Sequence, residues 1–135
     1  MNKIKIQVLF GFFMIAITIL ACSGSVSTAK ISDAFLTTTS DEAGKTTVFT
    51  QDQPFYCIVR VSNAPDDTSL KAVWIAVNVD GVDPNMMIDE AELTTDGNSE
   101  FTFDLQNDML WPTGNYKVEI YLNGELNKTL EFEVR

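Results

Sequence analysis

The feature that most constrains this chain is the recurrence of short runs in which apolar and polar residues alternate, with no helical stripe after the N-terminal segment. The runs are rich in Val, Ile, Phe, Tyr and Thr, and clusters of Gly, Pro, Asn and Asp separate them. A period of two residues predicts half-buried strands, and the clusters predict turns. The predicted strands are Ile31–Thr38, a short Thr46–Phe49, Phe55–Ser62, Leu70–Val79, Met87–Thr94, Phe101–Leu105, Tyr116–Leu122 and Thr129–Val134.

These strands predict an all-β fold, because no helical crossover lies between them. About seven strands in about 100 residues are typical of an antiparallel immunoglobulin-like β-sandwich. The same spacing also fits a small barrel, which leaves the topology open.

The first residues of the chain are typical of a secretory signal peptide. Lys3 and Lys5 precede an uncharged run, residues 8–21, which ends in a small residue. The run is shorter than the ~20 apolar residues that cross a bilayer comfortably, so a cleaved signal is favoured over a transmembrane anchor, which remains the alternative.

The end of this run, Ile19-Leu20-Ala21-Cys22, resembles the lipobox of bacterial lipoproteins, with Ile where that family usually has Leu. The resemblance implies cleavage before Cys22 and a lipid on its thiol, and therefore attachment to the extracytoplasmic side of a bacterial membrane. Ser23 implies, by resemblance to lipoprotein sorting rules, the outer membrane if the host has one. We expect a signal peptide over residues 1–21, a lipidated Cys with a flexible tether over 22–30, and one β-sandwich domain over 31–135.

The chain is strongly acidic. Without Lys3 and Lys5 it carries seven basic and 19 acidic side chains, a formal charge of −12. This charge disfavours nucleic acid and bare anionic membranes as partners, since both repel it.

The sequence contains no His, which removes Ser–His and Cys–His nucleophile pairs and His-ligated zinc or haem. We therefore predict a non-enzymatic binding or accessory module of the cell envelope that works through a sheet face or a loop end. The alternatives are a calcium-stabilised surface or adhesion module, and an envelope hydrolase that uses two carboxylates. Cys57 lies on the same face of its predicted strand as Phe55 and Val59 and is predicted to be a buried, inert thiol.

Acidic turns raise the hypothesis of a calcium site, because Ca²⁺ binds several carboxylate and carbonyl oxygens together. The candidate ligands are Asp80 and Asp83 in one turn, and Asp96 and Glu100 in another. Neither turn matches the EF-hand pattern. The competing interpretation is a charged surface that protects an edge strand.

Large apolar side chains occur on both faces of two predicted strands, Phe55–Ser62 and Leu70–Val79, although a sandwich sheet needs only one apolar face for the core. Trp74, Tyr56 and Ile58, with Tyr121, are therefore candidates for an exposed patch that binds a protein or a glycan. The alternatives are that a loop covers these residues, or that inside and outside are inverted in one strand. Met86, Met87 and Met109 could be soft copper(I) ligands, but packing in the core and at an edge is the preferred interpretation.

The segment from Trp111 to Gly124 contains a Tyr behind a Pro and a Gly. Tyr116 in this segment resembles the tyrosine corner of immunoglobulin and fibronectin type III domains, in which the hydroxyl anchors the preceding corner. From roughly Val48 to Val134 the chain resembles single-domain sandwich modules of bacterial lipoproteins and other secreted proteins. The immunoglobulin disulfide is absent.

The last two strands should form a hairpin. A two-residue Asn123-Gly124 loop would place Lys117 opposite Leu130, which pairs an outward residue with an inward one. We therefore expect a three-residue loop that ends in a left-handed Gly124 and pairs Tyr116 with Leu130.

Overall fold

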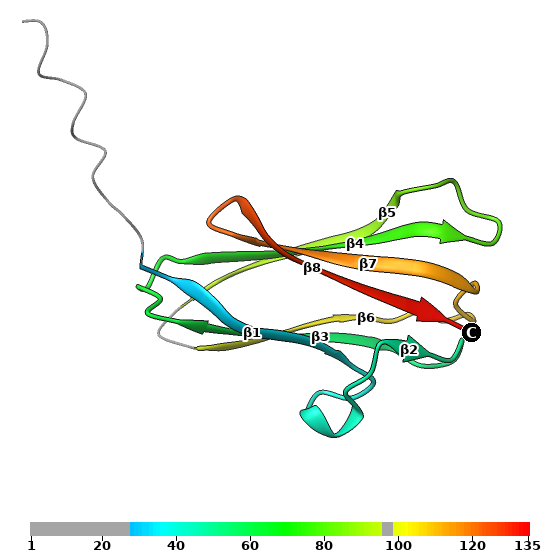
Figure 1. The fold of residues 1–135 in the computed structure, drawn as a ribbon, viewed down its shortest axis with the longest axis horizontal. Coiled ribbons are helices and arrows are strands. Elements are labelled where there is room, and N and C mark those ends of the chain that lie inside the picture. The colour runs from blue at the N-terminus through cyan, green and yellow to red at the C-terminus, as the bar shows by residue number, and fades with distance from the viewer. Residues whose placement is uncertain (1–27, 96–98) are drawn as a thin grey trace, which may run out of the picture.

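A computed structural model describes residues 28–95 and 99–135, which form two β-sheets packed face to face (Figure 1). Every predicted strand is present, and the bounds move by a few residues at most, apart from a longer final strand. The strands are β1 (Lys30–Thr37), β2 (Val48–Phe49), β3 (Phe55–Ser62), β4 (Ser69–Val79), β5 (Met86–Thr94), β6 (Glu100–Leu105), β7 (Gly114–Leu122) and β8 (Glu125–Val134).

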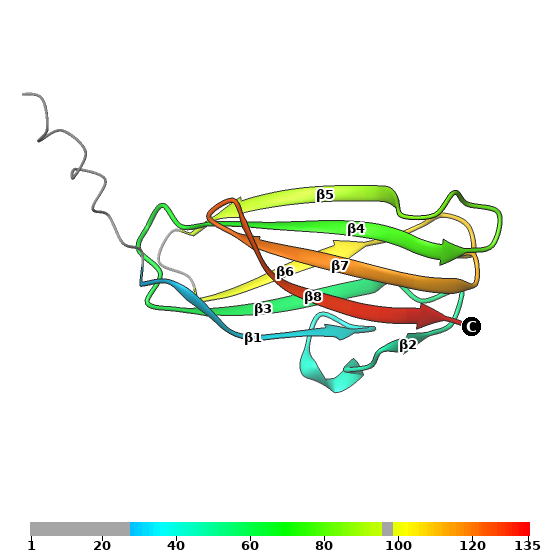
Figure 2. The same cartoon turned by 45° about the horizontal axis from the view of Figure 1, so that its top comes forward.

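The topology is that of a sandwich rather than a barrel. One sheet has the order β1-β3-β6, and the other has the order β2-β8-β7-β4-β5. The chain leaves the first sheet after β1, forms a short 3-10 turn (Glu42–Gly44) and joins the second sheet as β2, which runs parallel to β8. All other pairs are antiparallel, as expected. Figure 2 shows β5 at the outer edge of the larger sheet.

An aromatic cluster forms the core between the sheets. Phe55 lies at its centre and packs its ring against Trp111 at 4.6 Å and against Phe132 at 4.8 Å between centroids. The predicted inward residues of β7, Tyr116, Val118 and Ile120, are all buried. Alternation in β7 therefore fills the core as the sequence pattern indicates.

Strand β4 corrects one prediction. Trp74 faces the core and is 2% exposed, so inside and outside were inverted for this strand. Its inward neighbours Ala72 and Ala76 are small, which leaves room for the indole ring between the sheets. A bulge between Ala76 and Asn78 then turns Val79 inward as well.

The β7–β8 hairpin corrects a second prediction. Its loop has two residues, Asn123 and Gly124, with φ values of 51° and 84°, as a type I′ turn requires. The extra residue is Asn127 in β8, because Tyr121 pairs with Leu126 and Ile120 pairs with Lys128.

The bulge in β8 repairs the register that a plain hairpin would have broken. Tyr116 lies opposite Phe132 and not opposite Leu130, so the predicted pairing is displaced by two residues. Inward residues still pair with inward residues, because a shift of two leaves the facing of every side chain unchanged.

The tyrosine corner is present. The Tyr116 hydroxyl donates a 2.6 Å hydrogen bond to the carbonyl oxygen of Pro112. The same loop is tied to the β2–β3 turn, since the Trp111 N–H donates to the carbonyl of Gln51 and Gln51 Nε2 donates to the carbonyl of Trp111. These bonds fix the β6–β7 loop, residues 106–113, against the core.

The two ends of the sandwich differ in their relation to the N-terminus. Lys30, predicted to end the tether, begins β1 opposite Ser62, and the Thr28 hydroxyl lies 3.4 Å from the carbonyl of Asn63. We call this the entry end. The opposite end, where β4 ends and β5 and β7 begin, is the far end (Figure 1).

The predicted signal peptide, Cys22 and most of the tether lie outside the described residues. Within residues 28–95 and 99–135, no helix is long and apolar enough to cross a membrane.

Candidate binding surface at the far end

The predicted patch of Trp74, Tyr56, Ile58 and Tyr121 does not form. Trp74 lies in the core, and Ile58 is also 2% exposed. Tyr56 and Ile58 belong to β3 in the smaller sheet, whereas Tyr121 belongs to β7 in the larger one. These residues do not share one surface.

Ile58 is buried although it lies on the outer face of its sheet. It pairs with Phe35 of β1, and the Lys45 ammonium and the Arg60 guanidinium lie over the Phe35 ring at 4.8 Å and 5.3 Å. Arg60 also forms an ion pair of 2.7 Å with Glu42 of the 3-10 turn. The loop after β1 therefore folds over Phe35 and Arg60, the neighbours of Ile58, and Ile58 does not reach the surface.

The predicted calcium ligands do not converge. Asp80 lies at the far end and accepts a 2.8 Å hydrogen bond from the Thr113 hydroxyl, while Glu100 lies at the entry end and pairs with Arg60 at 2.9 Å. Asp83 follows Asp80 in the β4–β5 turn, and Asp96 lies outside the described residues. In the part of the chain that the structure describes, no three His, Cys, Asp or Glu side chains are grouped to hold a metal ion.

Cys57 is buried, as predicted. Burial raises the pKa of its thiol to about 12, because the thiolate would lose its hydration in the core. The thiol is therefore unsuited to nucleophilic chemistry.

The far end contains an apolar hollow of about 260 Å³. On one side it is lined by Ala76 and Val79 of β4, by Val82 of the following turn and by Met86 of β5; on the other side Trp111 and Pro112 of the β6–β7 loop close it. The Tyr116 hydrogen bond that fixes Pro112 therefore also shapes the wall of the hollow.

The hollow exists because β5 overhangs the smaller sheet. Met86 pairs with Ala76 and so faces the core side of the larger sheet, yet its side chain is 51% exposed. The β5 strand pairs only with β4 and makes few contacts with β6, the facing edge of the other sheet. Met86 is consequently left half uncovered by the described chain, whereas Ile88 still packs against the core.

Exposed apolar side chains lie in the hollow and in the loop beside it. Among the described residues, seven large apolar side chains are exposed; Met86 and Met87 at 53% line the hollow, and Met109 at 77% and Leu110 at 62% belong to the β6–β7 loop that closes it. Apolar side chains exposed at one end of a domain, next to an apolar hollow, are a feature of interaction sites. Methionine also adapts its unbranched side chain to different partners.

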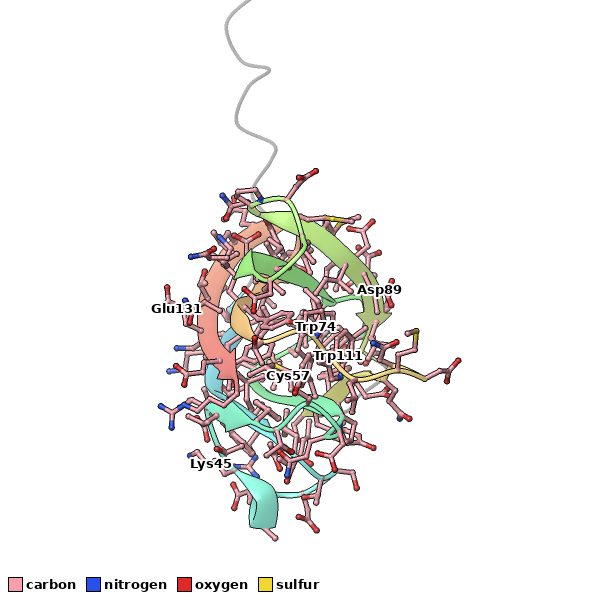
Figure 3. All side chains as sticks on the ribbon, turned by 90° about the vertical axis from the view of Figure 1, so that its right-hand side faces the viewer. Lys45, Cys57, Trp74, Asp89, Trp111 and Glu131 are labelled. Carbon is pink, nitrogen blue, oxygen red and sulfur yellow. The ribbon has the colours of Figure 1, made fainter. Side chains whose placement is uncertain are left out.

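Carboxylates follow the lining residues along the chain. Val79, Val82, Ile88 and Asn107 line the hollow, and each is followed directly by an exposed aspartate: Asp80, Asp83, Asp89 and Asp108. No Lys or Arg occurs from Ala72 to Tyr116. Figure 3 views this end directly, with Trp111 near the middle and Asp89 toward the periphery. The hollow is thus an apolar site in a negative surface.

Sequence reasoning missed this surface, because it assigned Met86, Met87 and Met109 to packing. The available indication was the occurrence of large apolar residues in or beside turns, as in Met86-Met87 and Met109-Leu110, where polar residues are usual. Chemically, the site offers apolar contact and negative charge, which suit non-covalent binding.

Comparison with known proteins bears on the fold. An immunoglobulin-like protein from Pseudomonas aeruginosa superimposes with a TM-score of 0.54 at 15% identity, over 83% of this chain and 100% of that one. The domain described here has an immunoglobulin-like fold. Its Trp74 is buried on β4 between the two sheets, and immunoglobulin domains likewise carry a buried Trp between their sheets.

Two enzymes contain a similar module. The alkylpurine DNA glycosylase AlkC of Pseudomonas fluorescens matches with a TM-score of 0.50 at 16% identity, over 79% of this chain and 30% of that one. A GH3 β-glucosidase of Bifidobacterium adolescentis matches with a TM-score of 0.50 at 15% identity, over 79% of this chain and 17% of that one. At such identities the likeness concerns the fold alone. No family model and no curated protein matches the chain.

Proposed function

We propose that this protein is a non-enzymatic envelope lipoprotein, anchored through Cys22, that binds a protein partner at the far end of its sandwich. The single observation that carries the proposal is the apolar hollow, with exposed Met86 and Met87 in its lining and exposed Met109 and Leu110 in the adjoining loop. The immunoglobulin-like fold is compatible with a binding module.

The position of the hollow suits a membrane-anchored protein. The chain enters the domain at Lys30, at the opposite end of the sandwich. A lipid on Cys22 would hold the entry end near the bilayer, since the seven residues between Cys22 and Lys30 reach at most ~25 Å. The far end would then face away from the membrane, where a partner can reach it.

The size of the hollow favours a protein partner over a small metabolite. Small-molecule sites usually have about 300–1,000 Å³, and this hollow has about 260 Å³. An apolar cavity of about 150 Å³ already accepts benzene, so the space fits one large side chain. One anchored side chain within a wider apolar surface is the usual arrangement of a protein–protein hot spot.

The experiment places charge in the hollow and in the loop beside it. The doubly substituted Met86→Glu/Leu110→Glu protein is compared with wild type by native electrophoresis of membranes solubilised in a mild detergent. The matched control is Leu93→Glu/Leu126→Glu, which adds the same charge at exposed apolar residues of the entry end. Circular dichroism and thermal unfolding verify that each variant is folded.

We expect wild type and the control to migrate in a complex larger than the monomer, and the far-end variant to migrate as a monomer. A far-end variant that stays in the complex, or a wild-type protein that is monomeric in its own membranes, contradicts the proposal.

A further inference from the structure

We infer that the hollow receives an extended protein segment in which one large apolar side chain is flanked by Lys or Arg. This inference rests on the function proposed above and specifies the chemistry of the partner. The apolar lining defines the anchor, and the charges around it define the flanks.

The four aspartates that follow lining residues, here called the rim aspartates, are available to a partner. The ion pairs among the described residues use Arg60, Lys117 and Arg135, and none of them involves Asp80, Asp83, Asp89 or Asp108. Asp80 is partly engaged by Thr113, and one oxygen of Asp89 accepts the Glu90 N–H. All four residues are exposed, and each directly follows a residue that lines the hollow.

The charge pattern selects among possible occupants. A second copy of this chain would bring the same aspartates against this rim, and like charges in contact cost several kcal/mol at an interface. Anionic lipid headgroups and nucleic acid are repelled in the same way. A cationic segment is attracted, because no Lys or Arg within Ala72–Tyr116 offsets the acids there. Arg135, which follows β8 at the same end, is already paired with Glu133.

Recognition through side chains fits this edge better than addition of a sixth strand to the sheet. The Glu90 amide, midway along β5, is already bonded to Asp89 Oδ1 at 2.8 Å. A bulge between the Trp74 and Ile75 pairings further disturbs the edge ladder of β5. The partner segment would therefore cross the far end and insert its apolar side chain there.

The test uses two labelled peptides, acetyl-Lys-Lys-Phe-Lys-Lys-amide and its counterpart with Ser in place of Phe. Binding to the full-length protein in nonionic detergent is followed by fluorescence anisotropy up to about 1 mM protein, where weak single-anchor contacts are measurable. The rim variant is Asp83→Asn/Asp89→Asn/Asp108→Asn, which keeps Asp80 because of its bond to Thr113. The control, Asp66→Asn/Asp67→Asn/Glu125→Gln, removes the same charge from exposed residues of the entry end.

We expect the Phe peptide to bind wild type and control equally, and the rim variant about tenfold more weakly, since three exposed charge pairs are lost. The Ser peptide should bind about tenfold more weakly than the Phe peptide, because it leaves the hollow empty. Equal binding of the Phe peptide to the rim variant and the control overturns the inference, as does equal binding of the two peptides to wild type.

The two proposals fail differently. If Met86→Glu/Leu110→Glu disrupts the native complex while the rim variant changes neither the complex nor peptide binding, the far end binds a partner but not a cationic one. If Met86→Glu/Leu110→Glu leaves the complex intact, the proposed function itself is wrong, and this inference falls with it.

Discussion

The hydroxyl of Tyr116, the third residue of β7, donates a hydrogen bond to the carbonyl of Pro112 four residues earlier. The bond joins scaffold and binding surface, because Pro112 and Trp111 line the hollow and Trp111 stacks on Phe55 in the core. The β6–β7 loop is therefore anchored to the core, while Met86, Met87 and Met109 remain exposed.

Replacing Tyr116 by Phe removes this hydrogen bond and keeps the ring that stacks on Phe132. The carbonyl of Pro112 loses its partner, so we expect the free energy of unfolding to fall by about 1–2 kcal/mol. Urea unfolding measures it, with an unchanged m-value showing that the fold persists. An unchanged midpoint would mean that water replaces the hydroxyl at no cost.

Gly114 and Gly124 form a natural comparison, because both have positive φ, at 147° and 84°. A Cβ on Gly114 would lie 2.6 Å from the Val79 Cα and would also overlap the backbone of Asn78, whereas nothing lies within 4 Å of one on Gly124. We expect Gly114→Ala to cost about 3 kcal/mol or more and Gly124→Ala about 1 kcal/mol. Thermal unfolding of both variants measures the difference, and equal destabilisation would show that β4 yields to the added methyl group.

Trp74 and Tyr56 were candidates for one exposed patch, and the burial of Trp74 separates them. Trp74→Ala removes an indole ring that packs near Phe55 and Phe132, so a loss of about 3–5 kcal/mol is expected. Tyr56→Ser, at a half-buried residue of the outer face, should cost about 1 kcal/mol or less. Denaturant titration compares them; a folded Trp74→Ala protein with wild-type stability contradicts the packing described here.

The sequence pattern predicted most of the fold and little of the site, for a physical reason. Where polar residues alternate with apolar ones, as in Tyr116–Leu122, parity alone identifies the inward face. In Ser69–Val79 both faces of the strand carry apolar side chains, so the pattern does not say which face is buried. The face with Trp74 is the inward one, although the small Ala72 and Ala76 beside it make that face look less apolar than the other.

The binding surface escaped prediction because its residues follow no period. Val82, Met86 and Pro112 come from turns and strand ends that meet only after the sheets have formed. The hairpin shows the same limit: alternation predicted that Tyr116 and Phe132 share a side, but two positions for the bulge satisfy that condition equally.

The buried thiol of Cys57 predicts a pH dependence. Its pKa is about 12 in the folded state against an ordinary value of 9.0, so above about pH 9 the unfolded state releases a proton that the folded state keeps. Stability therefore falls as the pH rises from about 9 toward 12. By pH ~10 the free energy of unfolding of the wild type falls by about 1 kcal/mol through this thiol, a loss that Cys57→Ala does not show.

Urea titrations of wild type and Cys57→Ala at pH ~8 and ~10 isolate this contribution, because all other titrating groups are common to both proteins. Parallel losses in the two proteins would mean that the thiol is not protected by burial.

The central claim, that the far end is the binding surface, is tested most directly by site-specific photocrosslinking in intact cells. A photoreactive amino acid replaces either Met86 at the far end or Leu126 at the entry end, two side chains exposed to nearly the same extent at 51% and 52%. We predict one discrete adduct from Met86 that disappears when Leu110→Glu is added, and none from Leu126. Adducts of equal yield from both positions, or none from Met86, would contradict the account.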